Sequence, residues 1–253
     1  MMRAVTEAHD HALAARLAAS AGEILRATRA SGLVEGRELG QAGDAVAHEW
    51  LCRVLRTQRP DDGLLSEEGD PGAPDRQTRE RVWIVDPLDG TREYSEDRHD
   101  WAVHVALTVA GSVEVAAVAL PGLDELYSTA EPVSLTQREG DGPVRIAVSR
   151  TRPPDFAEHV ASAVGGELVP LGSSGYKTLA VVRGEVDAYV HGGGQWEWDV
   201  AAPAGVAMHA GLHVSRVDGS PMTFNEPEPK LPDQLVCRPE LADRILGAIA
   251  DAG

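Results

Sequence analysis

The chain has 253 residues, of which 43% are hydrophobic, so one large domain or two lobes with a sizeable core are expected. Its 40 acidic residues outnumber the 23 basic ones and give a net charge of −17, which argues against non-specific binding to nucleic acid polymers or anionic membranes. Only two cysteines occur, residues 1–19 do not resemble a signal peptide, and no run reaches the ~18–20 apolar residues of a membrane span, so we expect a soluble cytoplasmic protein.

The first half of the chain is predicted to contain two helices followed by a sheet. Apolar residues at helical spacing predict helices over residues 5–30 and 43–56. A loop rich in Gly, Pro and Asp follows at residues 69–79. Closely spaced β-rich runs then predict an antiparallel or mixed sheet. These runs lie at residues 82–85, 103–109, 113–120 and 126–128.

The second half is predicted to alternate strands with helices, which is typical of an α/β arrangement. A polar stretch at residues 131–143 is the predicted boundary between an α+β lobe (1–135) and an α/β lobe (143–253). Strands are expected at residues 144–148, 168–171 and 188–191, and helices at residues 153–164, 174–183, 199–210 and 240–252.

An apolar strand leads directly into a pair of aspartates. We expect the strand at residues 82–85 to stop at Asp86-Pro87, because proline cannot donate a hydrogen bond to a sheet. The segment from Asp89 to Thr91 is then a turn that leads into a helix. Two carboxylates at a strand end, just before free backbone N–H groups, suit a hard cation beside a phosphate.

Further acidic residues lie at other segment ends. Glu67 and Glu68 follow a short apolar run, Asp44 lies at a predicted helix start, and Asp199 is expected to be a helix N-cap. Each alone is explained as a cap, a turn or surface charge. Together, carboxylates from distant parts of the chain could surround a divalent cation that prefers oxygen ligands. The nine histidines lack paired zinc spacing, so we expect surface or core roles for them.

Three motifs, in this order, resemble the inositol monophosphatase superfamily of magnesium-dependent, lithium-sensitive phosphatases. They are Glu67-Glu68, the run from Asp86 to Thr91, and Trp198-Asp199. The resemblance covers essentially the whole chain and implies a layered αβαβα sandwich. The run Asp-Gly-Thr-Arg-Glu-Tyr and the segment from Leu171 to Lys177 look most like the 3′(2′),5′-bisphosphate nucleotidases of the CysQ type.

The resemblance also implies two magnesium ions, with a weaker third ion within reach of Glu67. The implied ligands are carboxylates and one backbone carbonyl: Glu67, Asp86, the carbonyl of Leu88, Asp89, Asp199 and, in the outer shell of the third ion, Glu68. Asp86 would bridge the first two ions. Two such ions can neutralise a phosphate ester, acidify a bound water and stabilise the leaving group.

The catalytic residues implied by the resemblance are Asp44, Thr91 and Glu67. The hydroxyl of Thr91 would pair with Asp44 to orient the attacking water, and the backbone of Gly90 and Thr91 would hold the scissile phosphate. The full set of implied substrate contacts is Asp89, Gly90, Thr91, Arg92, Arg150, Ser173, Lys177 and Asp199.

Two features favour a bisphosphorylated nucleotide over inositol phosphate. Inositol-preferring members carry an acid seven residues before the aspartate of Trp-Asp, and here that residue is Gly192, which leaves room for a bulkier group. Basic residues could receive a second phosphate. They are Arg92, where nucleotidase-type members carry Lys or Arg, and Arg150, Arg152, Lys177 and Arg183 in the second lobe.

We therefore expect the chain to remove the 3′-phosphate of 3′-phosphoadenosine 5′-phosphate, giving AMP and phosphate and supporting sulfate assimilation. The sulfated form, 3′-phosphoadenosine 5′-phosphosulfate, is a second expected substrate. Two alternatives stay open: an inositol-1-phosphate or fructose-1,6-bisphosphate phosphatase, and a metal-dependent ligand-binding protein without catalysis. The expected partner is a small phosphorylated nucleotide, and the sequence leaves monomer and homodimer open.

Overall fold

The computed structural model of the protein describes residues 2–69, 76–136 and 142–252. The predicted loop at 69–79 and the predicted lobe boundary at 131–143 therefore lie partly outside the described residues. In the part of the chain that is described, no helix combines the length and the apolar character needed to cross a membrane.

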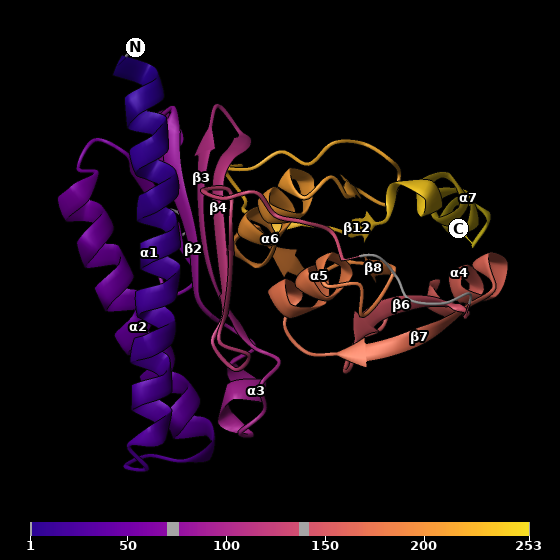
Figure 1. The fold of residues 1–253 in the computed structure, drawn as a ribbon, viewed down its shortest axis with the longest axis horizontal. Helices are drawn as coiled ribbons and strands as arrows, with labels where there is room; N and C mark the ends of the chain where they lie inside the picture. The colour runs from indigo at the N-terminus through magenta and orange to yellow at the C-terminus, as the bar shows by residue number, and fades with distance from the viewer. Residues whose placement is uncertain (1, 70–75, 137–141, 253) are drawn as a thin grey trace.

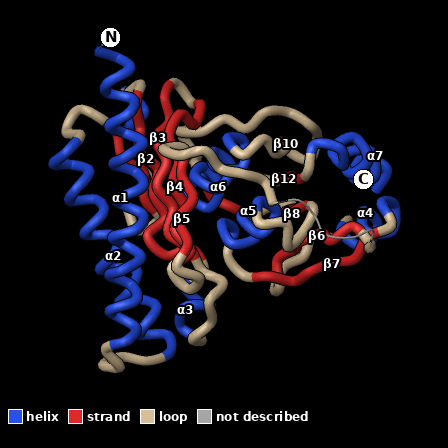
Figure 2. Tube along the Cα trace, in the orientation of Figure 1, coloured by secondary structure: helices blue, strands red, loops and turns tan. Residues whose placement is uncertain are grey.

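Five layers stack in the order helices, sheet, helices, sheet, helices, which confirms the predicted αβαβα sandwich (Figure 1). The first outer layer contains α1 (Met2–Ala30) and α2 (Gly36–Gln58). The central layer contains α5 (Ser174–Val182) and α6 (Glu197–His209), and Figure 2 shows this layer between the two groups of strands. The second outer layer contains α4 (Ala157–Val164) and α7 (Ala242–Ala252).

The first sheet has the strand order β1-β2-β3-β4-β5. Its strands are β1 (Gly63–Ser66), β2 (Arg81–Asp89), β3 (Ala102–Val109), β4 (Ser112–Leu120) and β5 (Glu125–Ser128). The pair β1·β2 is parallel and the other pairs are antiparallel, so the predicted mixed sheet is confirmed. The short helix α3 (Thr91–Ser95) follows β2, where a turn into a helix was predicted.

The second sheet has the strand order β10-β12-β8-β6-β7 and is also mixed. Its strands are β6 (Val144–Ser149), β7 (Gly166–Leu171), β8 (Ala188–His191), β10 (His213–Ser215) and β12 (Gln234–Cys237). Strands β10 and β12 were not predicted from the sequence. Short elements complete the described chain: β9 (Gln195–Trp196) paired with β11 (Lys230–Leu231), and the 3₁₀ turns Arg76–Thr78 and Pro239–Leu241.

The apolar strands are explained by burial on both faces of each sheet. In β2, Trp83 and Val85 face α1 and α2, whereas Val82 and Ile84 belong to the cluster beneath α5 and α6. A strand buried on both faces has apolar residues at consecutive positions instead of alternating ones. Two further apolar clusters join the second sheet to the helices on each side of it, so every pair of adjacent layers shares a core.

Three local predictions were wrong. Strand β2 does not stop at Asp86-Pro87 but continues to Asp89, because its pairing with β3 shifts register between Asp86 and Asp89 and Pro87 lies in that irregular stretch. Helix α2 begins at Gly36, so Asp44 lies well inside it and is not at its start. Helix α6 begins at Glu197 after the N-cap Trp196, so Asp199 is its third residue and not its cap.

The proposed division into lobes 1–135 and 143–253 stays a prediction. Each sheet is built from one side of the described chain, as the division expects. The central helices α5 and α6 come from the second part but also pack against the first sheet. The central layer therefore joins the two parts over an extensive apolar surface.

The close approach of α6 to the first sheet gives a test of the fold. A Cβ on Gly205 would lie 2.6 Å from Val113 Cγ1 and 2.7 Å from Ala116 Cβ, so Gly205→Ala should lower the free energy of unfolding by about 1–3 kcal/mol. The matched change Gly247→Ala in α7 meets no atom within 4 Å and should raise the free energy of unfolding by up to about 1 kcal/mol. Urea unfolding of both variants measures the difference, and equal effects would contradict this packing.

Candidate functional site

Three aspartates meet where β2 ends and α6 begins. Each of Asp86, Asp89 and Asp199 offers a carboxylate oxygen, and these oxygens lie within 4.8 Å of one another. Asp86 and Asp89 are buried, at 1% and 8% exposure. A set made only of oxygen donors matches the preference of Mg²⁺ and not that of zinc. The residues present therefore fit the metal that the sequence analysis expected.

Asp86 is the most deeply buried member of the cluster. The backbone N–H of Leu88 donates to Asp86 Oδ1 at 3.0 Å, which fixes the carboxylate at the irregular end of β2. Burial and the negative charges of Glu67, Asp89 and Asp199 raise the pKa of Asp86 well above its usual value. A cation at this point would remove that electrostatic penalty.

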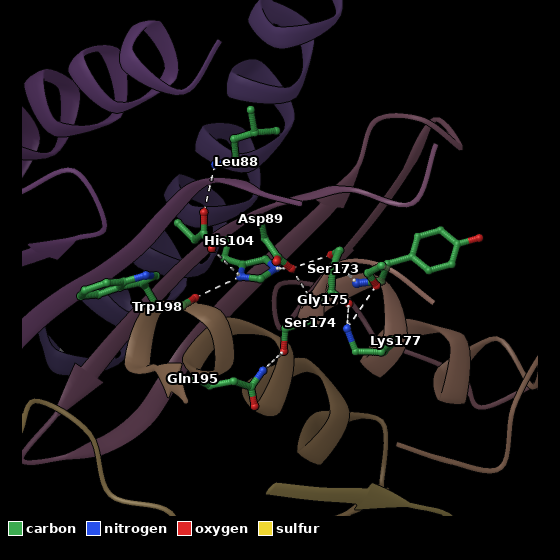
Figure 3. Close-up of polar contacts among 12 residues, drawn as sticks. Leu88, Asp89, His104, Ser173, Ser174, Gly175, Lys177, Gln195 and Trp198 are labelled. Atoms are coloured by element: carbon green, nitrogen blue, oxygen red, sulfur yellow. Dashed lines mark hydrogen bonds and ion pairs between the residues drawn. The ribbon is translucent and has the colours of Figure 1, made fainter. Parts of the chain in front are cut away.

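Asp89 differs because the protein supplies donors for one of its oxygens. Asp89 Oδ2 accepts hydrogen bonds from Ser173 Oγ (2.5 Å) and from the backbone N–H of Gly175 (2.7 Å) (Figure 3). Burial alone would raise the pKa of Asp89, but His104, Lys177 and Ser173 outweigh it and lower the pKa to about 2. Asp89 is therefore ionised at neutral pH.

Asp199 is held by the first turn of α6. Its Oδ2 accepts a hydrogen bond from the backbone N–H of Trp196 at 2.7 Å, which satisfies a donor that a helix start leaves unpaired. Burial and the charge of Asp89 raise the pKa of Asp199 to about 6. The same bond orients the carboxylate toward the end of β2.

Glu67, Glu68 and Asp44 border the cluster. Glu67 is exposed at the end of β1, yet partial desolvation by the protein around it and the charge of Asp199 raise its pKa to about 7. Asp44 is buried in α2, and burial together with the charges of Glu67 and Glu68 raises its pKa to about 8. These mutual effects place all three residues in one electrostatic group with the aspartates.

Thr91 lies beside α2, where Asp44 is located. A Cβ on Gly40, one helical turn before Asp44, would lie 2.8 Å from Thr91 Cγ2, so glycine permits this close contact. The Thr91 hydroxyl donates to the carbonyl of Leu88 at 3.1 Å. The pairing of Thr91 with Asp44 around a water stays a prediction, as does the role of the Leu88 carbonyl as a metal ligand.

A polar pocket of ≈ 180 Å³ opens beside the aspartates. Its lining includes Asp89, Asp199, Arg152 and Gly194, and residues from both parts of the chain contribute to it. Six of the eight predicted substrate contacts line it: Asp89, Gly90, Arg150, Ser173, Lys177 and Asp199. Thr91 and Arg92 are not among its lining residues. Gly90 adopts φ +92°, a left-handed conformation that favours glycine.

The basic side chains around the pocket differ in how many hydrogen bonds they already make within the protein. Arg150 donates to Glu93 (2.8 Å) and to Asp100 (2.5 Å). The buried Lys177 ammonium donates to the carbonyls of Gly172 and Ser173, and burial lowers its pKa to about 8. Each residue therefore uses part, but not all, of its donors within the protein.

Two other predicted cations lie away from the pocket lining. Arg92 is exposed and pairs with Glu96 at 2.8 Å in the next turn. Arg183 pairs with Glu185 at 2.8 Å. Arg152 does line the pocket, is exposed, and makes no ion pair or side-chain hydrogen bond with the other described residues. Within the described part of the chain, it is thus the pocket arginine whose guanidinium donors are all unused.

His104, for which a surface or core role was predicted, is a core residue that lies beside the aspartate cluster; its nearness to the aspartates was not predicted. It is fully buried in β3, with Nε2 3.2 Å from Asp89 Oδ2 and Nδ1 3.9 Å from Asp86 Oδ2. Asp86 and His104 are direct partners across β2 and β3. The signal that could have placed His104 next to Asp86 is the register between β2 and β3, which becomes known only when the two strands are paired.

Comparisons with known proteins agree with this geometry. The family model described as "Inositol monophosphatase family" matches residues 7–252. A 3′-phosphoadenosine 5′-phosphate phosphatase of Mycobacterium leprae is 47% identical, over 97% of this chain and 95% of the relative. The 3′(2′),5′-bisphosphate nucleotidase CysQ of Escherichia coli is 34% identical, over 74% of this chain and 80% of the relative. The structure is also similar to that of CysQ from Bacteroides thetaiotaomicron, with a TM-score of 0.77 and 24% identity over 90% of this chain and 97% of that one.

The raised pKa values predict that magnesium binding depends on pH. Carboxylates with a raised pKa stabilise the fold below that pKa, and this contribution is lost as the pH rises through about 6 for Asp199 and about 7 for Glu67. Magnesium binds the ionised forms and displaces their protons. We expect the affinity for Mg²⁺ to be roughly tenfold or more weaker at about pH 6 than at about pH 8. The rise in Tm on adding Mg²⁺ should also be smaller at the lower pH.

Calorimetric titrations with Mg²⁺ in two buffers of different ionisation enthalpy measure both the affinity and the protons released. Equal affinity at both pH values, without proton release, would contradict the assignment of these carboxylates to the metal site.

Proposed function

The chain belongs to the inositol monophosphatase family, and from this premise we propose that it is a magnesium-dependent phosphatase acting on 3′-phosphoadenosine 5′-phosphate. The reaction would remove the 3′-phosphate and give AMP and phosphate, as part of sulfate assimilation. The observation that carries this proposal is the 47% identity, over 97% of the chain, to a phosphatase named for this substrate.

We assign the metal ligands to Asp86, Asp89 and Asp199, with Glu67 and the Leu88 carbonyl completing the set and Glu68 in an outer position. When bound, magnesium supplies charge neutralisation and an acidified water. The number of ions, two or three, belongs to the proposal. The close approach of the three aspartate oxygens supports the core of this assignment.

The protein's own groups would complete the reaction. Asp44 is buried near Glu67 and Glu68, and its pKa is raised to about 8; in its ionised form, which becomes populated as the pH rises toward that value, it would accept a proton from the attacking water. We propose that Thr91 exchanges its hydrogen bond with Leu88 for one that orients this water. Gly90, at the pocket wall before α3, would hold the scissile phosphate with its backbone N–H.

The environment of Gly192 supports a nucleotide over inositol 1-phosphate. A Cβ at this position would lie 2.7 Å from Pro154 Cβ and 3.2 Å from the Phe156 ring, so no acidic side chain fits there. This corrects the expectation that Gly192 leaves room for a bulkier substrate group, because Pro154 and Phe156 fill that space. The acid that inositol-preferring members use is absent from this position.

We place the second phosphate of the substrate at Arg152. A phosphate needs donors that the protein has not already used, and Arg152 supplies them in the lining of the pocket. Arg150 and Lys177 already donate to Glu93 and to Ser173, so each has fewer unused donors for the phosphate than Arg152. Their own contacts with the substrate stay predictions.

The remaining parts of the proposal concern the cellular compartment, the oligomeric state and the other substrates of the enzyme. Both cysteines are free and buried, as expected for a protein of the reducing cytoplasm. The sulfated nucleotide is proposed as a second substrate, and the choice between monomer and homodimer stays open. Inositol 1-phosphate and fructose 1,6-bisphosphate are the alternative substrates on the same site.

A substrate panel tests the function. Phosphate release with Mg²⁺ should be faster from 3′-phosphoadenosine 5′-phosphate than from inositol 1-phosphate or fructose 1,6-bisphosphate. Asp89→Asn removes one ligand charge and should lower kcat by roughly a thousandfold or more while circular dichroism stays unchanged. A preference for inositol 1-phosphate would overturn the substrate, and retained activity in Asp89→Asn would remove this residue from the metal site.

A second experiment tests the phosphate contact. Arg152→Gln should raise KM for 3′-phosphoadenosine 5′-phosphate by about 10–100-fold, because a charge-assisted hydrogen bond to phosphate is lost. The kcat/KM for adenosine 3′-phosphate, which lacks the 5′-phosphate, should not change. Arg53→Gln, the same charge change on the exposed face of α2, is the matched control. Equal losses on both substrates would place the second phosphate elsewhere.

A further inference from the structure

His104 makes contacts that reach both sides of the proposed metal site. It is fully buried in β3, opposite Asp86, and its side chain shares the face of the first sheet that α5 and α6 cover. The proposed reaction does not by itself require an imidazole at this depth. A buried polar ring in an apolar layer is costly unless its nitrogens find partners.

One nitrogen of His104 bonds the backbone that carries Asp199. Nδ1 lies 3.0 Å from the carbonyl oxygen of Trp198, and since a carbonyl can only accept, Nδ1 is the donor. Trp198 directly precedes Asp199 in the first turn of α6. The position of the Asp199 main chain is therefore tied to the ring of His104.

The other nitrogen of His104 faces Asp89. Nε2 lies 3.2 Å from Asp89 Oδ2, the same oxygen that accepts from Ser173 and Gly175. Figure 3 shows the ring between Asp89 and Trp198. Nε2 makes no hydrogen bond with the described residues, and since Nδ1 already carries a proton, the contact with Asp89 is an ion pair when Nε2 carries a second one. The rigid ring thereby limits how closely Asp89 can approach the start of α6.

Gly175 makes this arrangement possible. A Cβ at this position would lie 2.1 Å from His104 Nε2, so any side chain would displace the ring. The backbone N–H of Gly175 meanwhile donates to Asp89 at 2.7 Å. One residue of α5 thus gives space to the ring and binds the carboxylate that the ring approaches.

We infer that His104 is a positioning residue that sets the spacing of Asp89 and Asp199, so that together they bind one divalent cation. The inference rests on the proposed metal site but not on the proposed substrate. Groups that orient metal ligands commonly affect metal affinity by about 10–100-fold when they are removed. His104 would act through the two aspartates without contacting the ion.

The test measures Mg²⁺ binding by calorimetry without substrate, alongside the Mg²⁺ concentration for half-maximal activity. His104→Leu keeps an apolar side chain in the layer but removes both contacts, and should weaken Mg²⁺ binding by about 10–100-fold. His104→Gln and His104→Asn each keep one amide and should lose less affinity. Thr108→Val is the matched control, since it removes one buried hydrogen bond, to the carbonyl of Val82, from the same strand.

Thr108→Val should lower Tm without changing Mg²⁺ affinity. Unchanged Mg²⁺ affinity in the His104 variants, with only a lower Tm as in Thr108→Val, would overturn the inference and make His104 a packing residue. If His104→Leu does not fold, the Mg²⁺ affinities of His104→Gln and His104→Asn are compared with that of Thr108→Val instead. Failure of the unmodified protein to bind Mg²⁺ would instead refute the metal site, whereas binding with no turnover would refute only the substrate.

Discussion

The candidate site is organised around three carboxylates that are buried close together. Asp86, Asp89 and Asp199 bring carboxylate oxygens within 4.8 Å of one another, and two of these residues are almost inaccessible to solvent. Burying like charges together is unfavourable unless donors, protons or a cation compensate. Several neighbouring groups provide part of this compensation. Backbone N–H groups bind Asp86 and Asp199, and Asp89 receives donors from α5 and lies beside His104.

The layered fold explains how such a cluster forms. The end of β2 supplies two of the aspartates, and the first turn of α6 supplies the third from the central helical layer. Since α6 packs against the first sheet, helix start and strand end are held together by the apolar core. A side chain at Gly205 would disturb this packing without changing any of the three aspartates. Stability and ligand geometry thus share one interface.

Much of the fold and of the metal site could be predicted from local sequence. Long apolar runs predicted the main strands, and the acidic motifs pointed to Asp86, Asp89 and Asp199, whose carboxylate oxygens the structure brings together. The role of Glu67 as a metal ligand stays a prediction. Short elements were harder, as β12 has only four residues and takes its place in the sheet from its neighbours β10 and β8. Predicted strand and helix boundaries were also wrong where tertiary contacts overrode local signals. One example is Pro87, which was expected to end β2 but lies in an irregular stretch of that strand.

The sequence by itself determined the chemistry available, namely the oxygen ligands, the order of the motifs and the apolar patterns of the layers. Only the tertiary structure decided which side chains have partners. Arg150 and Arg152 are two residues apart and both line the pocket, yet Arg150 binds Glu93 and Asp100 whereas no ion pair to Arg152 occurs among the described residues. His104 and Trp198 are 94 positions apart and still share a hydrogen bond. Such pairings depend on distances between remote segments, which local spacing does not encode.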